Sequence, residues 1–212
     1  MKMASRQKLK ILLATRNNDK IREIREVLTG LDIDILTLDQ FPEITEVVED
    51  GQTIQENALK KARAVSHVTH LLALADDTGL EVDYLSGQPG VYSSRFAGES
   101  ATYDDNCNKL LEQMKGVPGE QRTARFRCVI AMINSDVETL VEGVCDGFII
   151  DEKRGSGGFG YDPLFYVPKF DQTFAEMPLA QKNKISHRGL ALQKAKAFLQ
   201  ELITDLNNEK KS

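Results

Sequence analysis

Two long apolar segments in the middle of the chain do most to limit how it can fold. Residues 124–133 and 139–150 have the length and composition of β-strands, and Asn134, Ser135 and Asp136 mark the bend between them. A connection this short joins antiparallel neighbours, because a parallel crossover needs about a dozen or more residues. The chain therefore contains a long β-hairpin, and its other elements must pack around it.

Strands and helices alternate on the N-terminal side of this hairpin. Residues 9–14 and 33–38 predict strands, and residues 20–28 between them carry apolar side chains at helical spacing. A second helix is expected after Thr53, followed by a short buried strand at 71–75 that ends at Asp76. Alternation followed by a hairpin predicts an α/β fold with a mixed sheet and helices on its faces.

Capping residues mark three helix starts. Thr53 with Glu56 has the spacing of a capping box, and Thr102 with Asp105 marks another helix start. Because Glu56 has this structural role, we leave it out of any metal site. Ser186 is expected to cap a last helix that leads into a frayed tail at residues 207–212. We see no linker, so the sequence predicts a single domain over 1–212.

Composition excludes several classes of protein. A net charge of -5 argues against a chain that coats nucleic acid, and apolar runs of five residues are far shorter than a membrane span of about 20. The N-terminus predicts a first strand and not a signal peptide. The three cysteines form no C-x-x-C pair, so we expect buried thiols in a reducing compartment, without zinc or disulfides.

The turn at residues 15–20 is the first candidate site. It joins the first strand to the first helix, where free N–H groups and the positive end of the helix dipole suit a phosphate. Thr15 and Asn17 can add side-chain donors, and Lys20 adds a charge. No Walker A pattern is present. The alternative is an ordinary turn in which Asn or Asp caps the helix.

Acidic residues form the second candidate site. Glu46, Glu49 and Asp50 share one loop, and Asp76 and Asp77 follow a predicted strand. If that strand continues, the two aspartates face opposite sides, so that one can hold Mg2+ while the other orients or deprotonates water. The alternative is a plain acidic turn.

Two further segments combine unusual residue types. Residues 155–160 hold four glycines in six positions, with Phe159 among them, which suits close approach of a ligand and stacking of a planar base. His187 and Arg188 begin the last helix, where positive charge opposes the dipole, and this conflict favours a functional role. The alternatives are a flexible surface loop and a solvated basic turn. His67 and His70 are interpreted as structural.

Seven motifs together resemble one family, the inosine triphosphate pyrophosphatases, also called XTP/dITP diphosphatases. They occur in order over roughly residues 9–203, which is nearly the whole chain. They are T-x-N-x-x-K at 15–20, E-N-A-x-x-K-A at 56–62, A-D-D-T-G-L at 75–80, P-G-V-Y-S-S-R at 89–95, A-R-F-R-C at 124–128, G-G-F-G-Y-D-P at 157–163 and I-S-H-R-G at 185–189.

The resemblance implies a cytoplasmic, Mg2+-dependent hydrolase that is usually a homodimer. Such enzymes convert ITP, dITP and XTP to the monophosphate and pyrophosphate, which removes these nucleotides before polymerases use them. The implied fold is an elongated mixed sheet flanked by helices, as one pyrophosphatase domain with a core at about 9–203. The implied partner is a small nucleoside triphosphate, with no nucleic acid and no membrane.

Site residues follow from the same resemblance, position by position. Asp77 is implied as the residue that activates water, and Glu49, Asp76 and Asp77 as metal ligands, with the choice between the two aspartates open. The residues implied to bind substrate are Thr15, Arg16, Asn17, Asn18, Asp19, Lys20, Lys61, Thr78, Phe159, Gly160, Tyr161, Asp162, Lys182, His187 and Arg188. Arg95 is a secondary candidate, from across a dimer interface. Asp19 would repel phosphates, so it must face away or serve as a cap.

Two other functions are weighed against this one. A pyrophosphatase of pyrimidine triphosphates would share the architecture, but the G-G-F-G-Y-D segment and the His187-Arg188 pair argue against it. A nucleotide-binding module without catalysis would lack metal ligands, whereas Glu49, Asp76 and Asp77 are all present.

Overall fold

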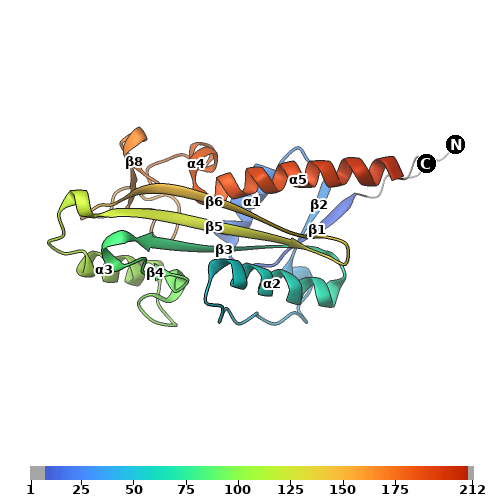
Figure 1. The fold of residues 1–212 in the computed structure, drawn as a ribbon, viewed down its shortest axis with the longest axis horizontal. Coiled ribbons are helices and arrows are strands. Elements are labelled where there is room, and N and C mark those ends of the chain that lie inside the picture. Colours follow the sequence, from blue (N-terminus) through green and yellow to red (C-terminus); the bar gives the residue numbers. More distant parts are fainter. Residues whose placement is uncertain (1–7, 210–212) are drawn as a thin grey trace.

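The computed structural model describes residues 8–209. Within them, eight strands form one mixed sheet in the order β2-β1-β3-β5-β6-β7-β8, and β4 pairs with β3 (Figure 1). The strands are β1 (Leu9–Leu13), β2 (Ile33–Thr37), β3 (Leu72–Val82), β4 (Pro89–Gly90), β5 (Thr123–Ile133), β6 (Glu138–Ile149), β7 (Phe165–Val167) and β8 (Gln172–Thr173). The helices are α1 (Asn18–Leu28), α2 (Ile54–Thr69), α3 (Tyr103–Gln113), α4 (Leu179–Ile185) and α5 (His187–Glu209).

The predicted class, an elongated mixed sheet flanked by helices, is confirmed. β1 pairs in parallel with β2 and β3, and the antiparallel part begins where β3 meets β5. The predicted hairpin is β5 with β6, paired from Thr123 opposite Phe148 to Ile133 opposite Glu138. In Figure 1 the long strands run along the molecule, with α2 on one side of the sheet and α5 on the other.

The strand β3 differs most from its prediction. The sequence predicted a strand that stops before Asp76, but β3 continues to Val82 and pairs with β5 from Ala73 to Val82. The polar run at 76–79 therefore lies inside a central strand and does not form a turn. It can do so because its charged side chains find partners on both faces of the sheet, as described below.

The core divides into layers on the two faces of β3. Leu74 packs in a cluster with Ile24 of α1 and Leu192 of α5, whereas Ala75 packs in a cluster with Ala62 of α2. Successive side chains on a strand point to opposite faces. Asp76 therefore faces α1 and α5, and Asp77 faces α2.

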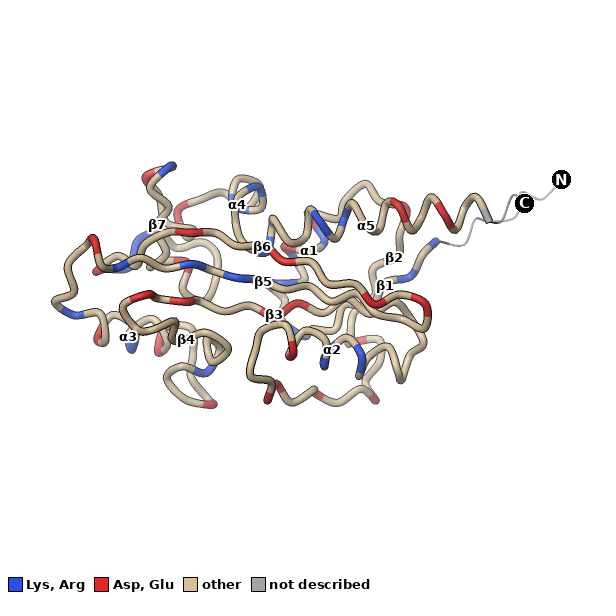
Figure 2. The backbone as a smooth tube through the Cα atoms, in the orientation of Figure 1, with Lys and Arg blue, Asp and Glu red and all other residues tan. Residues whose placement is uncertain are grey.

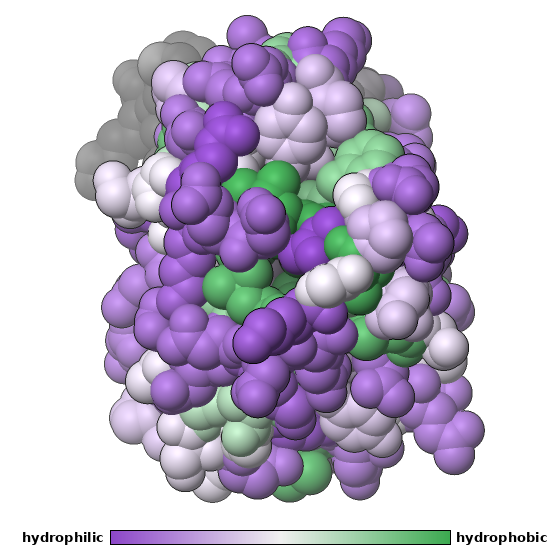
Figure 3. Space-filling view, turned by 90° about the vertical axis from the view of Figure 1, so that its left-hand side faces the viewer, coloured by the Kyte–Doolittle hydropathy of each residue, from purple (hydrophilic) through white to green (hydrophobic). Residues whose placement is uncertain are grey.

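A third cluster fills the end of the molecule away from the termini. Phe126, Phe165 and Phe174 pack there with Leu110 and Met114 of α3. Figure 3 views this end and shows apolar residues gathered within a largely hydrophilic surface. This cluster supports the segments that lead into and out of the Gly-rich loop.

Charged side chains join the three long strands on their partly exposed face. Arg127 on β5 donates from Nε to Glu81 on β3 at 2.9 Å and from Nη1 to Glu142 on β6 at 2.6 Å. Figure 2 shows the basic stretch of β5 between acidic stretches of its neighbours. Opposite charges on adjacent strands support the pairing of those strands.

The predicted helix starts are correct, with one difference in detail. Thr102 and Asp105 form a full capping box, and the Ser186 hydroxyl accepts a hydrogen bond from the N–H of Gly189 in α5. The Thr53 hydroxyl accepts from the N–H of Glu56, but the Glu56 carboxylate accepts from Gln52 and not from Thr53.

The ends of the chain and its thiols complete the fold. α5 continues to Glu209, so the first residues of the expected tail are helical, and Lys210 to Ser212 lie outside the described residues. The N-terminal residues 1–7 also lie outside them. The three cysteines are buried free thiols, as predicted. Between residues 8 and 209, every helix is too short or too polar to cross a bilayer.

Candidate active site

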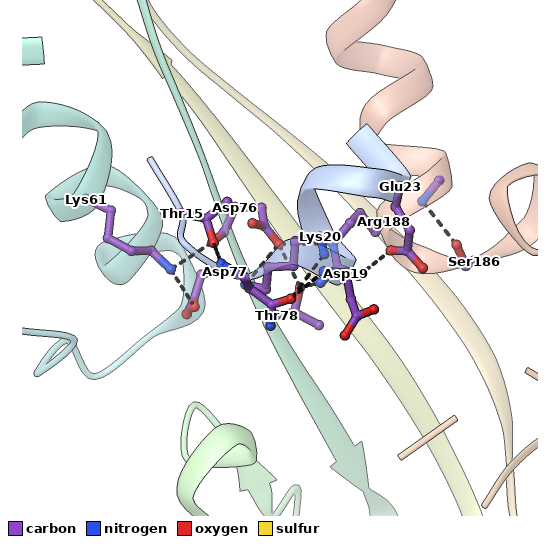
Figure 4. Close-up of polar contacts among 12 residues, drawn as sticks. Thr15, Asp19, Lys20, Glu23, Lys61, Asp76, Asp77, Thr78, Ser186 and Arg188 are labelled. Atoms are coloured by element: carbon purple, nitrogen blue, oxygen red, sulfur yellow. Dashed lines mark hydrogen bonds and ion pairs between the residues drawn. The ribbon is translucent and has the colours of Figure 1, made fainter. Parts of the chain in front are cut away.

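The neighbouring carboxylates of Asp76 and Asp77 lie at the centre of the site. Both residues are buried, and β3 directs their side chains to opposite faces of the sheet. In Figure 4, Lys61 and Asp77 lie to one side of β3, and Glu23 and Arg188 lie to the other. Two groups of charges, one on each face, are thus built from adjacent positions of one strand.

On the side of α1 and α5, Asp76 begins a continuous chain of buried ion pairs. Its Oδ2 accepts from Nε of Arg188 at 3.0 Å and lies 3.1 Å from Nζ of Lys20. Arg188 donates from Nη1 to Glu23 at 2.7 Å, and Glu23 accepts from Lys182 at 2.8 Å. These contacts bring α1, β3, α4 and α5 together at one point.

The same chain of ion pairs reaches the Gly-rich loop. Nζ of Lys182 donates to Oδ2 of Asp162 at 2.5 Å, and that oxygen also accepts from the N–H of Phe159 at 2.8 Å. Gly158 permits this arrangement, because its φ is +68° and a Cβ there would lie 2.0 Å from Asp162. The loop is therefore held by charge pairing and is not a flexible linker.

Electrostatics favours the ionised forms of Asp76 and Glu23, whereas burial raises the pKa of Asp162 more than Lys182 lowers it. Burial alone would raise the pKa of Asp76, but the charges of Lys20 and Arg188 outweigh it and hold that pKa far below its usual value. Burial would also raise the pKa of Glu23, and Arg188 and Lys182 lower it instead. Three cations face three carboxylates, so the formal charges balance; the groups are Lys20, Arg188, Lys182, Asp76, Glu23 and Asp162.

The α2 side of β3 has a different charge balance. Nζ of Lys61 donates to Glu49 at 2.6 Å, to Asp77 at 3.0 Å and to the carbonyl of Asp76 at 2.7 Å. One ammonium therefore serves two carboxylates, which leaves a formal charge of -1 among the three side chains. Burial raises the pKa of Asp77 by more than the positive charges of Lys61 and Lys20 lower it.

A small pocket opens beside this group. Its volume is about 100 Å³, and its polar lining includes Thr15, Lys20, Glu49 and Lys61. Nη2 of Arg95 donates to the carbonyl of Glu49 at 2.9 Å and so fixes the loop that carries this carboxylate. Arg95 reaches the site from its own chain in this structure.

The turn at residues 15–20 contains the helix cap that the sequence offered as its alternative role. Asn17 caps α1, because its Oδ1 accepts from the N–H groups of Asp19 and Lys20. Thr15 accepts from the N–H of Asn17 at 3.2 Å and lines the pocket. Capping by a side-chain oxygen leaves the positive helix end intact.

Three predicted residues of this turn are partly or fully exposed. Arg16 lines the pocket as well and donates to the carbonyl of Ile44 at 2.9 Å. Asn18 is exposed, and Asp19 pairs with Arg22 along the helix at 3.2 Å. The expectation that Asp19 faces away from the phosphate position fits this contact.

Two predicted residues have their side chains in the core. The Tyr161 ring is buried and its hydroxyl donates to the carbonyl of Ser93 at 2.9 Å. The His187 ring stacks on Phe126 at a centroid distance of 4.4 Å. Burial, more than the charge of Arg188, holds the pKa of His187 well below its usual value, so the imidazole is neutral.

Other members of the predicted base pocket do converge. The Phe159 ring is partly exposed, and Nζ of Lys182 and Cζ of Arg188 lie 5.0 Å and 5.3 Å from its centroid. Nη2 of Arg188 also donates to the Thr78 hydroxyl at 3.0 Å. Lys182 and Arg188 retain N–H groups beyond those used in these contacts, because an ammonium has three donors and a guanidinium five.

Glu23 is the central residue that the sequence analysis missed. It is buried and pairs with both Lys182 and Arg188. The available signal was its position three residues after Lys20, which puts both side chains on one face of α1. The separate helix α4, which carries Lys182, was also not predicted.

The acidic groups suit a hard divalent cation. Among residues 8–209, His, Cys, Asp and Glu form no group of three that could hold a metal by themselves. Mg2+, however, is commonly bound by one or two carboxylates together with phosphate oxygens. Glu49 and Asp77 provide two carboxylates with excess negative charge on the α2 face of β3. On the other face, Oδ1 of Asp76 is buried without a hydrogen-bond partner among the described residues. This set of donors fits the predicted metal.

Comparison with known proteins gives consistent matches over nearly the whole chain. The chain is 53% identical over 196 residues to the dITP/XTP pyrophosphatase of Desulforamulus reducens, which covers 92% of this chain and 97% of that protein. It is 50% identical to the dITP/XTP pyrophosphatase of Geobacter sulfurreducens, covering 90% and 96%. A solved HAM1 protein from Coxiella burnetii matches with a TM-score of 0.84 and 42% identity, covering 91% and 99%.

The family assignment follows from the same comparisons. The sequence model of the Ham1 family matches residues 11–198, a range that contains all seven motifs. The resemblance inferred from those motifs is thereby confirmed. Because about half of its residues are identical to those of full-length relatives, and because it shares the fold of solved members, this chain belongs to the Ham1 family.

Proposed function

We propose that this protein hydrolyses the deaminated purine nucleotides ITP, dITP and XTP to the monophosphate and pyrophosphate. The observation that carries the proposal is the 53% identity, over 97% of its length, to a relative named dITP/XTP pyrophosphatase. The site supports the same reaction, because a capped helix end, two lysines and an acidic group meet at one pocket.

The chain's own residues supply most of what the reaction needs. Lys20 and Lys61 carry positive charge beside the pocket, and Asn17 and Thr15 lie at the positive end of α1. These groups bind the triphosphate and stabilise the charge that develops on the leaving pyrophosphate, which is the main source of catalysis in phosphoryl transfer.

Asp77 is the residue proposed to accept a proton from the attacking water. Its carboxylate is 3.0 Å from Nζ of Lys61, so the base lies beside a phosphate-binding charge. We propose Mg2+ as the cofactor, held by Glu49 and Asp77, where it supplies additional charge neutralisation of the phosphates. The excess negative charge around Lys61 supports this assignment.

Base selectivity is proposed to depend on buried donors near Phe159. Hypoxanthine and xanthine carry an oxygen at C6, and Lys182 and Arg188 have N–H groups to donate. Adenine carries an amino group there, which would leave those donors unpaired at a cost of about 1–3 kcal/mol each. His187 is a further candidate, because its buried Nδ1 has no hydrogen-bond partner within residues 8–209. This base pocket is proposed to be bordered by the main chain of Gly160, Tyr161 and Asp162.

Three further properties are part of the proposal. The enzyme is expected to be a homodimer, to act in the cytoplasm and to use no nucleic acid or membrane as a partner. Sedimentation of the purified protein over a range of concentrations tests the dimer directly.

Product analysis tests the reaction itself. Purified protein is incubated with ITP, XTP, GTP, ATP and dTTP, each with and without Mg2+, and the products are separated by ion exchange. We expect IMP and XMP with pyrophosphate, only in the presence of metal, and little product from ATP or GTP. Nucleoside diphosphate with free phosphate would place the attack at the γ-phosphorus and overturn the mechanism. Absence of turnover would favour a binding module, and rapid loss of dTTP would favour the pyrimidine alternative.

A further inference from the structure

Tyr103 connects the two halves of the site that the proposed function treats separately. It is the first residue of α3, far in sequence from both the phosphate turn and the Gly-rich loop. Its hydroxyl accepts from Nδ2 of Asn17 at 2.9 Å, and its ring lies 5.9 Å from the ring of Phe159 at an angle of 44°. One side chain thus contacts the group that receives phosphate and the group that receives the base.

The contact with Asn17 has a fixed geometry. Oδ1 of Asn17 is occupied by the N–H groups of Asp19 and Lys20, so Nδ2 must point away from the helix. An amide nitrogen carries two N–H groups, and the Tyr103 hydroxyl accepts one of them. In the free protein the tyrosine oxygen therefore occupies one of the two donors that Asn17 can offer to a phosphate oxygen.

The helix that carries Tyr103 is anchored on the side of the Gly-rich loop. One turn further along α3, Sγ of Cys107 donates to the carbonyl of Gly160 at 3.3 Å, and Lys153 donates to Asn108 at 2.7 Å. Thr102 and Asp105 form the capping box that fixes the start of the helix. Tyr103 is thereby held at the edge of the site, although 44% of it remains exposed.

We propose that Tyr103 is a substrate-binding residue that closes the outer side of the nucleotide site. A phosphate oxygen replaces its hydroxyl at Asn17, and its ring then stacks on the purine beside Phe159. Aromatic side chains at this position favour a large planar base over a small one, since stacking scales with contact area. The inference rests on the proposed function for the identity of the base.

Two substitutions separate the ring from the hydroxyl. Tyr103→Phe keeps the ring and removes the acceptor, and Tyr103→Ala removes both. Tyr84→Ala is the matched control, because Tyr84 is 53% exposed on the turn after β3. Calorimetry measures binding of IMP alone and of tripolyphosphate alone, and steady-state kinetics gives kcat and KM for ITP.

Each variant has its own expected result. Tyr103→Ala should weaken IMP binding by roughly tenfold, consistent with the loss of one base-stacking contact, and raise KM with kcat within about threefold of wild type. Tyr103→Phe should keep IMP affinity but bind tripolyphosphate about two- to fivefold more tightly, because Asn17 no longer has a competing acceptor. Tyr84→Ala should match wild type in every assay.

The outcomes also separate this inference from the proposed function. If wild type hydrolyses ITP but Tyr103→Ala binds IMP normally, stacking is wrong while the function stands. Equal weakening of both ligands with a lower melting temperature would mean that Tyr103 only braces the fold. Unchanged tripolyphosphate affinity in Tyr103→Phe would overturn the exchange at Asn17. A wild type that neither hydrolyses ITP nor binds IMP would sink the proposed function, and the tripolyphosphate assay would still test the exchange.

Discussion

The two faces of β3 carry charge groups that differ in how positive and negative side chains are matched, although each group contains one of two adjacent aspartates. Asp76 meets two cations and belongs to a group in which positive and negative side chains balance. Asp77 shares a single ammonium with Glu49. Burial raises the pKa of both residues, but the cations around Asp76 outweigh it, whereas at Asp77 the like charge of Glu49 adds to burial.

This contrast separates a structural role from a chemical one. A buried carboxylate whose charge is matched by two cations holds elements together, and removing one partner leaves an uncompensated charge. A carboxylate with incomplete pairing next to a pocket can bind a cation or accept a proton. Neighbouring positions can take these separate roles because the pleat of a strand directs them into separate environments.

Replacing Asp76 should have the largest effect on stability. Asp76→Asn leaves Arg188 and Lys20 without their shared carboxylate in a buried site, and breaking such a pair costs about 3–5 kcal/mol. Chemical denaturation of the variant and wild type at neutral pH measures the change in the free energy of unfolding.

Asp83→Asn provides the matched control. Asp83 pairs with Arg125 at 3.2 Å near the surface, where both side chains are more than a third exposed. An exposed pair of this kind contributes less than about 1 kcal/mol. If both variants lose the same free energy of unfolding, the buried ion pairs around Asp76 contribute no more to stability than surface pairs do.

Replacing Asp77 should instead affect turnover. Asp77→Asn keeps the size of the side chain, and Lys61 retains Glu49, so the fold should persist. The kcat for ITP should fall by about 10²-fold or more, the lower range for loss of a general base. Circular dichroism melting verifies the fold, and near-normal turnover in a folded variant would reject the assigned role.

The close approach of α5 to the sheet gives a third prediction. A Cβ at Gly143 on β6 would lie 2.1 Å from the carbonyl oxygen of His187 and 2.5 Å from the N of Ala191. Gly143→Ala should therefore displace the start of α5, which carries Arg188, and destabilise the protein by about 1–3 kcal/mol. Thermal melting compares it with Gly119→Ala, because a Cβ at Gly119 meets nothing within 4 Å. Equal melting temperatures would show that α5 shifts without cost.

Much of this arrangement follows from local sequence patterns. Apolar periodicity and caps located α1, α2, α3 and α5, and the short bend at Asn134 located the hairpin. Element boundaries failed where polar residues are buried. The run at 76–79 was left open between a continuing strand and a turn, because hydropathy cannot show that Lys20, Lys61 and Arg188 neutralise it.

The site shows the same division between local and long-range information. Motifs located the residues that meet at the pocket, but not which side chains point toward it. Tyr161 and His187 lie within matching motifs, yet both side chains point into the core. Tyr161 donates a hydrogen bond to the Ser93 carbonyl, and the His187 ring stacks on Phe126. Glu23 shows the opposite case, since its importance comes from Lys182, which is distant in sequence.

Protonation of His187 should give the most gradual of these effects, because it grows only as the pH falls. Because burial and nearby cations hold the pKa of His187 well below the usual 6.5, the unfolded chain binds a proton that the native protein does not. The free energy of unfolding should thus fall as pH drops below about 6.5, by up to about 1.4 kcal/mol per pH unit from this group.

His187→Phe keeps an aromatic ring against Phe126 and cannot titrate. Denaturation at pH 7, 6 and 5 should show a shallower loss for His187→Phe than for wild type, whereas His67→Gln, at an exposed position, should keep the wild-type slope. Parallel curves for wild type and His187→Phe would mean that the imidazole takes up its proton in the folded state, and that the core behind Arg188 tolerates a charge.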